Sequence, residues 1–146
     1  MNKLIIVLIM LVALVTPSFA VESDYLPQIL VFPLGTTNAG TGAVSTTIVK
    51  VPANITVTGV FVSDSGGIAK DATDTAVVTL SDASTTLSTH TTATTAVTAN
   101  VPLAMTITAA HARVAKNAVL KCVLTKGASG KATTNASVYI TYIVGW

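Results

Sequence analysis

The stretch AVLKCVLT, residues Ala118–Thr125, decides the fold class, because apolar side chains recur in it at every second position. Leu120, Cys122 and Leu124 alternate with a second set of residues that includes Lys121. Successive side chains of a β-strand point to opposite faces, so the alternation predicts a strand with one buried face. Lys121 marks the face turned to solvent, since a lysine is rarely buried without a partner.

The same alternation recurs along the chain, and the helical period of about 3.6 residues does not appear after residue 20. Groups of Gly, Asn, Asp and Lys residues separate the alternating segments, as turns do. The sequence therefore predicts an all-β fold, a single antiparallel β-sandwich that is jelly-roll-like, with about seven or eight strands. Besides the segment at 118–125, we expect strands at 25–32, 44–51, 55–63, 76–80, 103–108 and 138–144.

Particular residues predict local features of these strands. Gly59 interrupts the segment 55–63, which is apolar on both faces, and indicates a bulge or a close approach of another backbone. Pro27 and Pro33 restrict the first strand to a sheet edge, because proline has no N–H to donate to a neighbouring strand. The Thr-rich region Thr85–Thr98 shows little periodicity, and we expect one exposed strand followed by a loop.

The first twenty residues have the form of an export signal. Lys3 precedes an unbroken apolar run, Leu4–Val15, and small residues suited to cleavage follow, with Ser18 at −3 and Ala20 at −1. The run is short for a membrane span, which needs about 20 residues. We expect an N-terminal hydrophobic signal helix cleaved after Ala20, with a retained anchor or a buried β-strand as the alternatives.

The predicted organisation has three parts: a signal peptide or short hydrophobic anchor at 1–20, an N-terminal arm with an edge strand at 21–43, and the β-sandwich domain at 44–146. Cys122 is the only cysteine, so no intrachain disulfide forms, and stability must come from packing or from assembly with copies of the chain. Charged residues are 10% of the chain and form no Lys/Arg cluster, so no nucleic-acid partner is expected.

Few side chains offer chemistry. His90 and His111 have no second histidine or carboxylate at metal-ligand spacing, so we expect exposed or loop histidines. Cys122 lies in a predicted strand, where burial makes a thiol inert. The chain has no Gly-x-Ser-x-Gly motif for a serine nucleophile, although a triad assembles in space and counting residues does not exclude one.

Asp64, Asp71 and Asp74 fall in one segment that also contains Gly66 and Gly67. Clustered carboxylates on such a loop are able to hold Ca²⁺, but the spacing fits no calcium motif, and turns capped by aspartate are the simpler interpretation. Whether the three aspartates bind an ion stays open at this point. The expectation is therefore a chain with no catalytic, cofactor-binding or metal-binding residues, no cofactor and no small-molecule substrate.

Two stretches of the chain carry a family resemblance. The first is IVKVPANITVTGV at 48–60, followed by DATD at 71–74 and the strand that ends at Leu80. The second begins at Leu103 and includes VAKNAVL at 114–120, TKGASG at 125–130 and SVYITY at 137–142. Together they resemble small β-sandwich structural proteins of tailed bacteriophages, of the capsid decoration or head-fibre type. A Gly-Asp turn of that pattern is Lys116-Asn117 here, and Asn also tolerates positive φ.

The resemblance implies a non-enzymatic virion component that acts by homo-oligomeric assembly on a surface lattice. The export signal favours an alternative, an exported bacterial cell-surface or fimbria-like subunit or adhesin. A secreted hydrolase or sugar-binding domain is the weakest of the interpretations. The expected partners are copies of the chain and a capsid or cell-surface lattice, with membrane contact only through residues 4–15 if they are retained. The expected location is the virion or an exported, extracellular surface.

Overall fold

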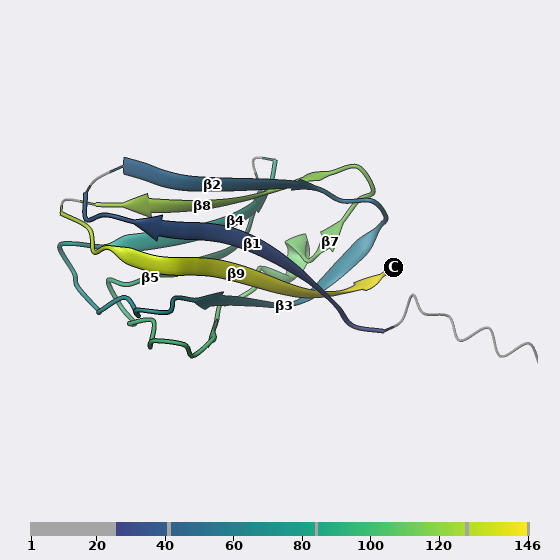
Figure 1. Cartoon of the computed structure of the whole chain (residues 1–146). Coiled ribbons are helices and arrows are strands. Elements are labelled where there is room, and N and C mark those ends of the chain that lie inside the picture. The colour runs from purple at the N-terminus through teal and green to yellow at the C-terminus, as the bar shows by residue number, and fades with distance from the viewer. Residues whose placement is uncertain (1–25, 41, 84, 128, 146) are drawn as a thin grey trace, which may run out of the picture.

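The computed structural model describes residues 26–40, 42–83, 85–127 and 129–145 (Figure 1). They form one short 3-10 helix, η2 (Ala109–His111), and nine strands. The strands are β1 (Gln28–Thr37), β2 (Gly42–Lys50), β3 (Ile55–Ser63), β4 (Ala76–Asp82), β5 (Thr85–Thr91), β6 (Leu103–Ala104), β7 (Arg113–Val114), β8 (Val119–Lys126) and β9 (Thr133–Val144). The signal helix expected in residues 1–20 lies outside the described residues.

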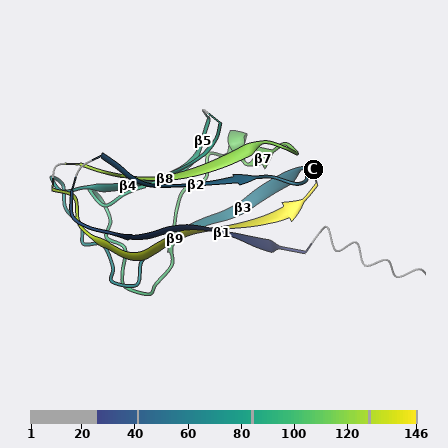
Figure 2. The ribbon, with the colours of Figure 1, turned by 45° about the horizontal axis from the view of Figure 1, so that its top comes forward.

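Two antiparallel sheets account for all nine strands. The order in sheet A is β1-β9-β3-β6, with β7 also paired to β3, and the order in sheet B is β2-β8-β4-β5. Figure 2 shows the two sheets as separate layers. The all-β, antiparallel prediction is confirmed. Within the described ranges, no helix is long and apolar enough to cross a membrane.

One hydrophobic core fills the space between the layers. Sheet A contributes residues such as Phe32, Val60 and Ile140, and sheet B contributes Leu80 and Leu124. Each of these side chains is at most 1% exposed. The alternation in 118–125 is confirmed, because Leu120, Cys122 and Leu124 are buried while Lys121 is exposed.

The bulge predicted at Gly59 is present and explains an apparent irregularity of the sequence. The register of β3 with β9 shifts between Val57 and Gly59. Val57 and Val60 therefore both face the core, although they stand three positions apart. The segment seemed apolar on both faces because the alternation changes phase here, and because Phe61 on the outer side is itself apolar.

The first strand is an edge strand, as predicted, and belongs fully to the sandwich. β1 pairs with β9 alone in sheet A, and its partners run from Tyr142 back to Thr133. Phe32 and Leu34 lie in the core, and the proline between them is tolerated at an edge. The division of the chain at residues 20 and 43 stays a prediction, while β1, from the expected N-terminal arm, shares the core of the strands that follow.

The strand expected at 103–108 is wrong in its extent. β6 covers only Leu103 and Ala104, which pair with β3 in sheet A. Ile107 instead forms an isolated bridge with Ser88 of β5 in sheet B. The segment crosses from one layer to the other, so its alternating apolar residues close the open side of the sandwich rather than extend one ladder.

The Thr-rich region is also more buried than expected. The register of β5 with β4 shifts between Leu80 and Ser81, and the consecutive residues Leu87 and Ser88 of β5 are 0% and 1% exposed. The following segment is tied down where Ile68 and Val97 exchange two backbone hydrogen bonds. The sequence did not reveal the burial of Leu87, because a single apolar residue among threonines shows no alternation. The turn at Lys116-Asn117 agrees with its prediction, since Asn117 has φ of 68°.

Candidate interaction surface

Asp64 is a structural carboxylate at the end of β3. It is fully buried, and its two oxygens accept the N–H of Gly66 at 2.9 Å and the N–H of Thr134 at 2.7 Å. The second bond joins the loop after β3 to the start of β9. Both oxygens therefore accept backbone hydrogen bonds that hold the fold together.

Asp71 and Asp74 form a separate, more exposed group. Asp71 accepts hydrogen bonds from the N–H of Thr73 and of Asp74 at 2.9 and 3.0 Å, which is the expected capped turn. The Nζ of Lys131 lies 3.3 Å from Oδ2 of Asp71 and 3.8 Å from Oδ2 of Asp74. The backbone donors and then Lys131 hold the pKa of Asp71 below its usual value. In the described ranges no three His, Cys, Asp or Glu side chains gather as a metal site would require.

Lys126 is a buried cation that the sequence interpretation did not single out. It is 2% exposed, and its Nζ donates to the hydroxyl of Thr37 at 2.6 Å and to the carbonyl of Asn38 at 2.8 Å. Desolvation lowers its pKa, and the charge of Asp64 partly offsets this. The alternation in β8 predicts an inward-facing side chain at position 126, because 126 continues the buried series Leu120, Cys122 and Leu124. The lysine joins the ends of β8 and β1 across the two layers.

Both histidines lie at β5, His90 within it and His111 beside it in η2, and His90 does not have the exposed or loop position expected for it. His90 lies within β5 and is half-buried, and its Nε2 has no hydrogen-bond partner among the residues that the structure describes. It lines a depression of about 290 Å³ together with Met105. His111 belongs to η2, and its Nδ1 is 3.0 Å from the carbonyl oxygen of Thr86. The two imidazole rings thus have different neighbours and do not line the same depression.

His90 should make the fold sensitive to acid. Desolvation lowers its pKa, and a hydrogen bond with the backbone of Thr95 offsets the shift in part. The unfolded chain therefore binds the proton more readily, so this contribution to stability is complete above about pH 6.5 and is lost as the pH falls through the lower, folded pKa. Urea midpoints at pH 7.5 and 5 should differ less for His90→Gln than for the unmodified chain. An equal difference in both proteins would contradict this role.

Cys122 is expected to be unreactive in the native protein. It is 0% exposed in the core of sheet B, and burial raises its pKa to about 12. Because the thiolate is the reactive form, a disulfide reagent at pH 8 should label it only after unfolding. Labelling followed across a urea titration should track the unfolding transition, whereas fast labelling of native protein would contradict the burial.

A different surface, the outer side of sheet A, gathers apolar side chains. We call it the apolar face and define it by Ile29, Val31, Phe61, Tyr139 and Thr141. Strand register brings them together: Val31, Tyr139 and Phe61 form one row across β1, β9 and β3, and Ile29 pairs with Thr141 in the next. Ile29 is 67% exposed and Val31 is 44% exposed. Tyr139 and Thr141 lie on the face of β9 opposite the buried Val138 and Ile140.

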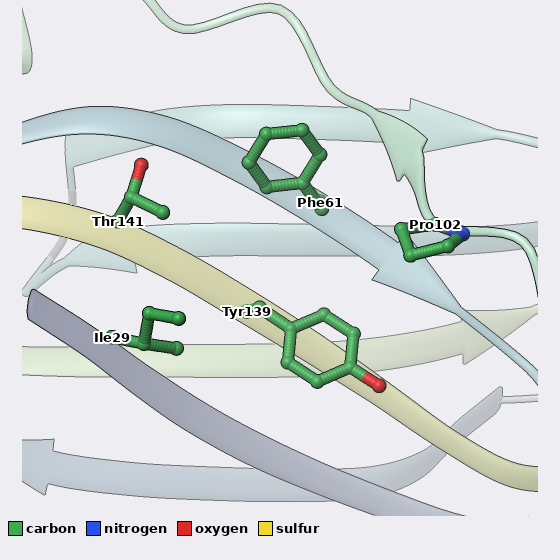
Figure 3. A pocket seen from close by; sticks show the side chains of 5 residues that line it. All are labelled: Ile29, Phe61, Pro102, Tyr139 and Thr141. Atoms are coloured by element: carbon green, nitrogen blue, oxygen red, sulfur yellow. The ribbon is translucent and has the colours of Figure 1, made fainter.

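A shallow depression of about 350 Å³ lies on this face (Figure 3). Ile29, Phe61, Tyr139 and Thr141 line it, together with Pro102 from the loop before β6. The missing side chain at Gly59 makes room for the Phe61 ring, since a Cβ there would lie 2.8 Å from that ring. The bulge thus shapes the surface as well as the core.

Charge is distributed unequally between the two layers. β1, β9 and β3 contain no Asp, Glu, Lys or Arg at all, and the exposed Arg113 of sheet A lies on β7 beside Thr56, away from the rows of the apolar face. On sheet B, Lys50 and Lys121 are exposed on the outer side. Charge-free strands are visible in the sequence, but only the pairing of the first, third and last long strands places them in one surface.

No protein-family model matches this chain, and no curated protein matches it significantly. Among solved structures, a structure of the infectious bursal disease virus Gx strain is similar at a TM-score of 0.30 and 15% sequence identity. The similarity covers 82% of this chain and 33% of that chain. The chain thus spans about a third of the length of the structure it matches.

Proposed function

We propose that this protein is a non-enzymatic structural component of a virion, of the capsid decoration or head-fibre kind, which assembles with copies of itself on a surface lattice. The observation that carries the proposal is the strand order. With β6 and β7 counted as one interrupted strand, the two sheets have the four-plus-four order of a jelly roll, the sandwich used by viral capsid domains, lectins and cupins.

The apolar face supports the assembly part of this proposal. Fold alone does not specify function, so a surface with the properties of a contact is needed in addition. The centres of protein interfaces are depleted of charged residues and enriched in aromatic ones. Val31, Phe61 and Tyr139 meet both conditions, because they lie side by side on strands without any charge. A lattice protein that presents such a surface many times gains affinity through avidity.

The alternative is an exported bacterial cell-surface or fimbria-like subunit, which the pattern of residues 1–20 favours. In fimbria-like assembly one chain adds a strand to the sheet edge of the next. β9 is unsuited to be the donated strand, because it is already paired with β1 on one side and β3 on the other. An exported subunit of this kind would have to use an edge strand such as β1 or β2.

The two proposals predict different locations and different N-termini. The protein would be purified from its source, its N-terminal residue determined, and its sedimentation with virions or with cell envelopes followed. Co-sedimentation with virions supports the virion role. A chain that begins at Val21 and is found in the envelope fraction would overturn it and support the exported subunit.

A further inference from the structure

The most informative surface is the apolar face, and we propose that it binds the same face of a second copy of this chain, across a two-fold axis. The proposal rests on the assembly function above and names its contact and its partner. In such a contact each copy offers the identical patch, so the patch must complement itself.

The character of the side chains excludes a charged partner. Ile29 and Val31 stand exposed beside the half-buried rings of Phe61 and Tyr139, and no carboxylate or cation belongs to the three strands. A charged group pressed against this surface would lose its water without gaining a counter-ion, which is costly. The partner surface must therefore also be free of charge.

A second copy supplies such a surface. The outer side of sheet B does not match, because exposed Lys50 and Lys121 lie on it. The same face of another protomer matches without change, since its strands are equally uncharged. Tyr139 lies in the central strand of the face, where its hydroxyl offers a hydrogen bond and its ring a large apolar area.

The size of the face sets the strength of the contact. The whole outer side of β1, β9 and β3, three strands about 4.8 Å apart and about nine residues long, covers roughly 450 Å², and the apolar face is only part of it. A stable interface buries about 800 Å² on each partner, so a dimer through this face alone should be weak. We therefore expect dissociation constants in the micromolar range and above, with many such contacts acting together in a lattice.

Sedimentation velocity of the full chain from 1 to about 200 µM tests the contact in that range. The informative variant is Ile29→Lys, and the matched control is Ile48→Lys, because Ile48 is 61% exposed on β2, an edge strand of the other sheet. The unmodified chain and Ile48→Lys should dimerise alike, while Ile29→Lys should bind at least about tenfold more weakly, because each copy then brings a like charge into an uncharged contact. Mixing Ile29→Lys with Ile29→Glu should restore association.

The identity of the occupant is tested by cross-linking. A photo-reactive residue at position 31 of the full chain should join β1 to strands of the apolar face of a second copy, as peptide mass spectrometry would show. Cross-links to residues 1–25 of the same chain would overturn the proposal, because the chain would then cover its own face. A chain that stays monomeric at every concentration, or equal weakening by Ile29→Lys and Ile48→Lys, would also overturn it.

The outcomes separate this inference from the function on which it rests. Dimerisation through the apolar face without co-sedimentation with virions overturns the virion role alone. Virion binding by a chain that is monomeric in solution, unaffected by Ile29→Lys, overturns the self-contact alone.

Discussion

Replacing Phe32 by alanine is expected to destabilise the protein by about 3–5 kcal/mol. The side chain is fully buried, and it is the phenylalanine that β1 contributes to the core. Its removal deletes apolar contacts and leaves a cavity between two layers whose backbones are fixed by strand pairing. A loss of this size is a large part of the 5–15 kcal/mol that stabilises typical domains, so partial unfolding at 37 °C is expected. Urea denaturation followed by circular dichroism measures it.

The matched control is Val31→Ala on the same strand. Val31 points to the outer side and is 44% exposed, so the change should cost less than about 1 kcal/mol at protein concentrations too low for self-association. If Phe32→Ala were as mild as Val31→Ala, β1 would not be part of the folded core. The result also decides whether the sandwich begins at residue 28 or only after residue 43.

Replacing Asp64 by alanine is expected to cost about 2–3 kcal/mol. The N–H groups of Gly66 and Thr134 would lose their acceptor, and a buried donor without a partner keeps its full desolvation penalty. Asp64→Asn should lie in between, because the amide retains only one oxygen acceptor. Asp82→Ala, on β4 and without a side-chain hydrogen bond to the described part of the chain, should change stability by less than about 0.5 kcal/mol.

The same measurement answers the question of calcium. Since the oxygens of Asp64 already accept backbone hydrogen bonds, added Ca²⁺ or a chelator should leave the urea midpoint of the unmodified chain unchanged. A ligand that binds only the folded state raises the free energy of unfolding with the logarithm of its concentration relative to the dissociation constant. A calcium-dependent rise that disappears in Asp64→Ala would therefore show that the loop is an ion site after all.

The bulge at Gly59 connects the core with the proposed contact. It changes the phase of β3, so that Val57 and Val60 both reach the core and Phe61 falls on the outer side. Without the extra residue, the strand would alternate evenly from Ile55 to Ser63, and the residues after Gly59 would exchange faces. One glycine therefore determines both the interior packing of β3 and the aromatic part of the apolar face.

The sequence by itself determined the fold class, because period-two alternation is a local property that each strand carries alone. It also predicted the Gly59 bulge, the edge position of the first strand and the inert Cys122, all from single residues whose backbone or burial preferences are strong. It failed where burial depends on distant partners: Leu103, Met105 and Ile107 looked like one strand, yet they bridge two sheets.

Only the tertiary structure decided which surfaces exist. Ile29, Phe61 and Tyr139 are far apart in the chain, and they share one surface only because β9 lies between β1 and β3. Likewise, Asp64 and Lys126 become buried because their hydrogen-bond partners, Thr134 and Thr37, arrive from other strands. Local propensity fixes the direction of a side chain along its own strand, whereas the order of strands in a sheet comes from packing the whole core. The apolar face depends on the order of strands, so the sequence alone did not predict it.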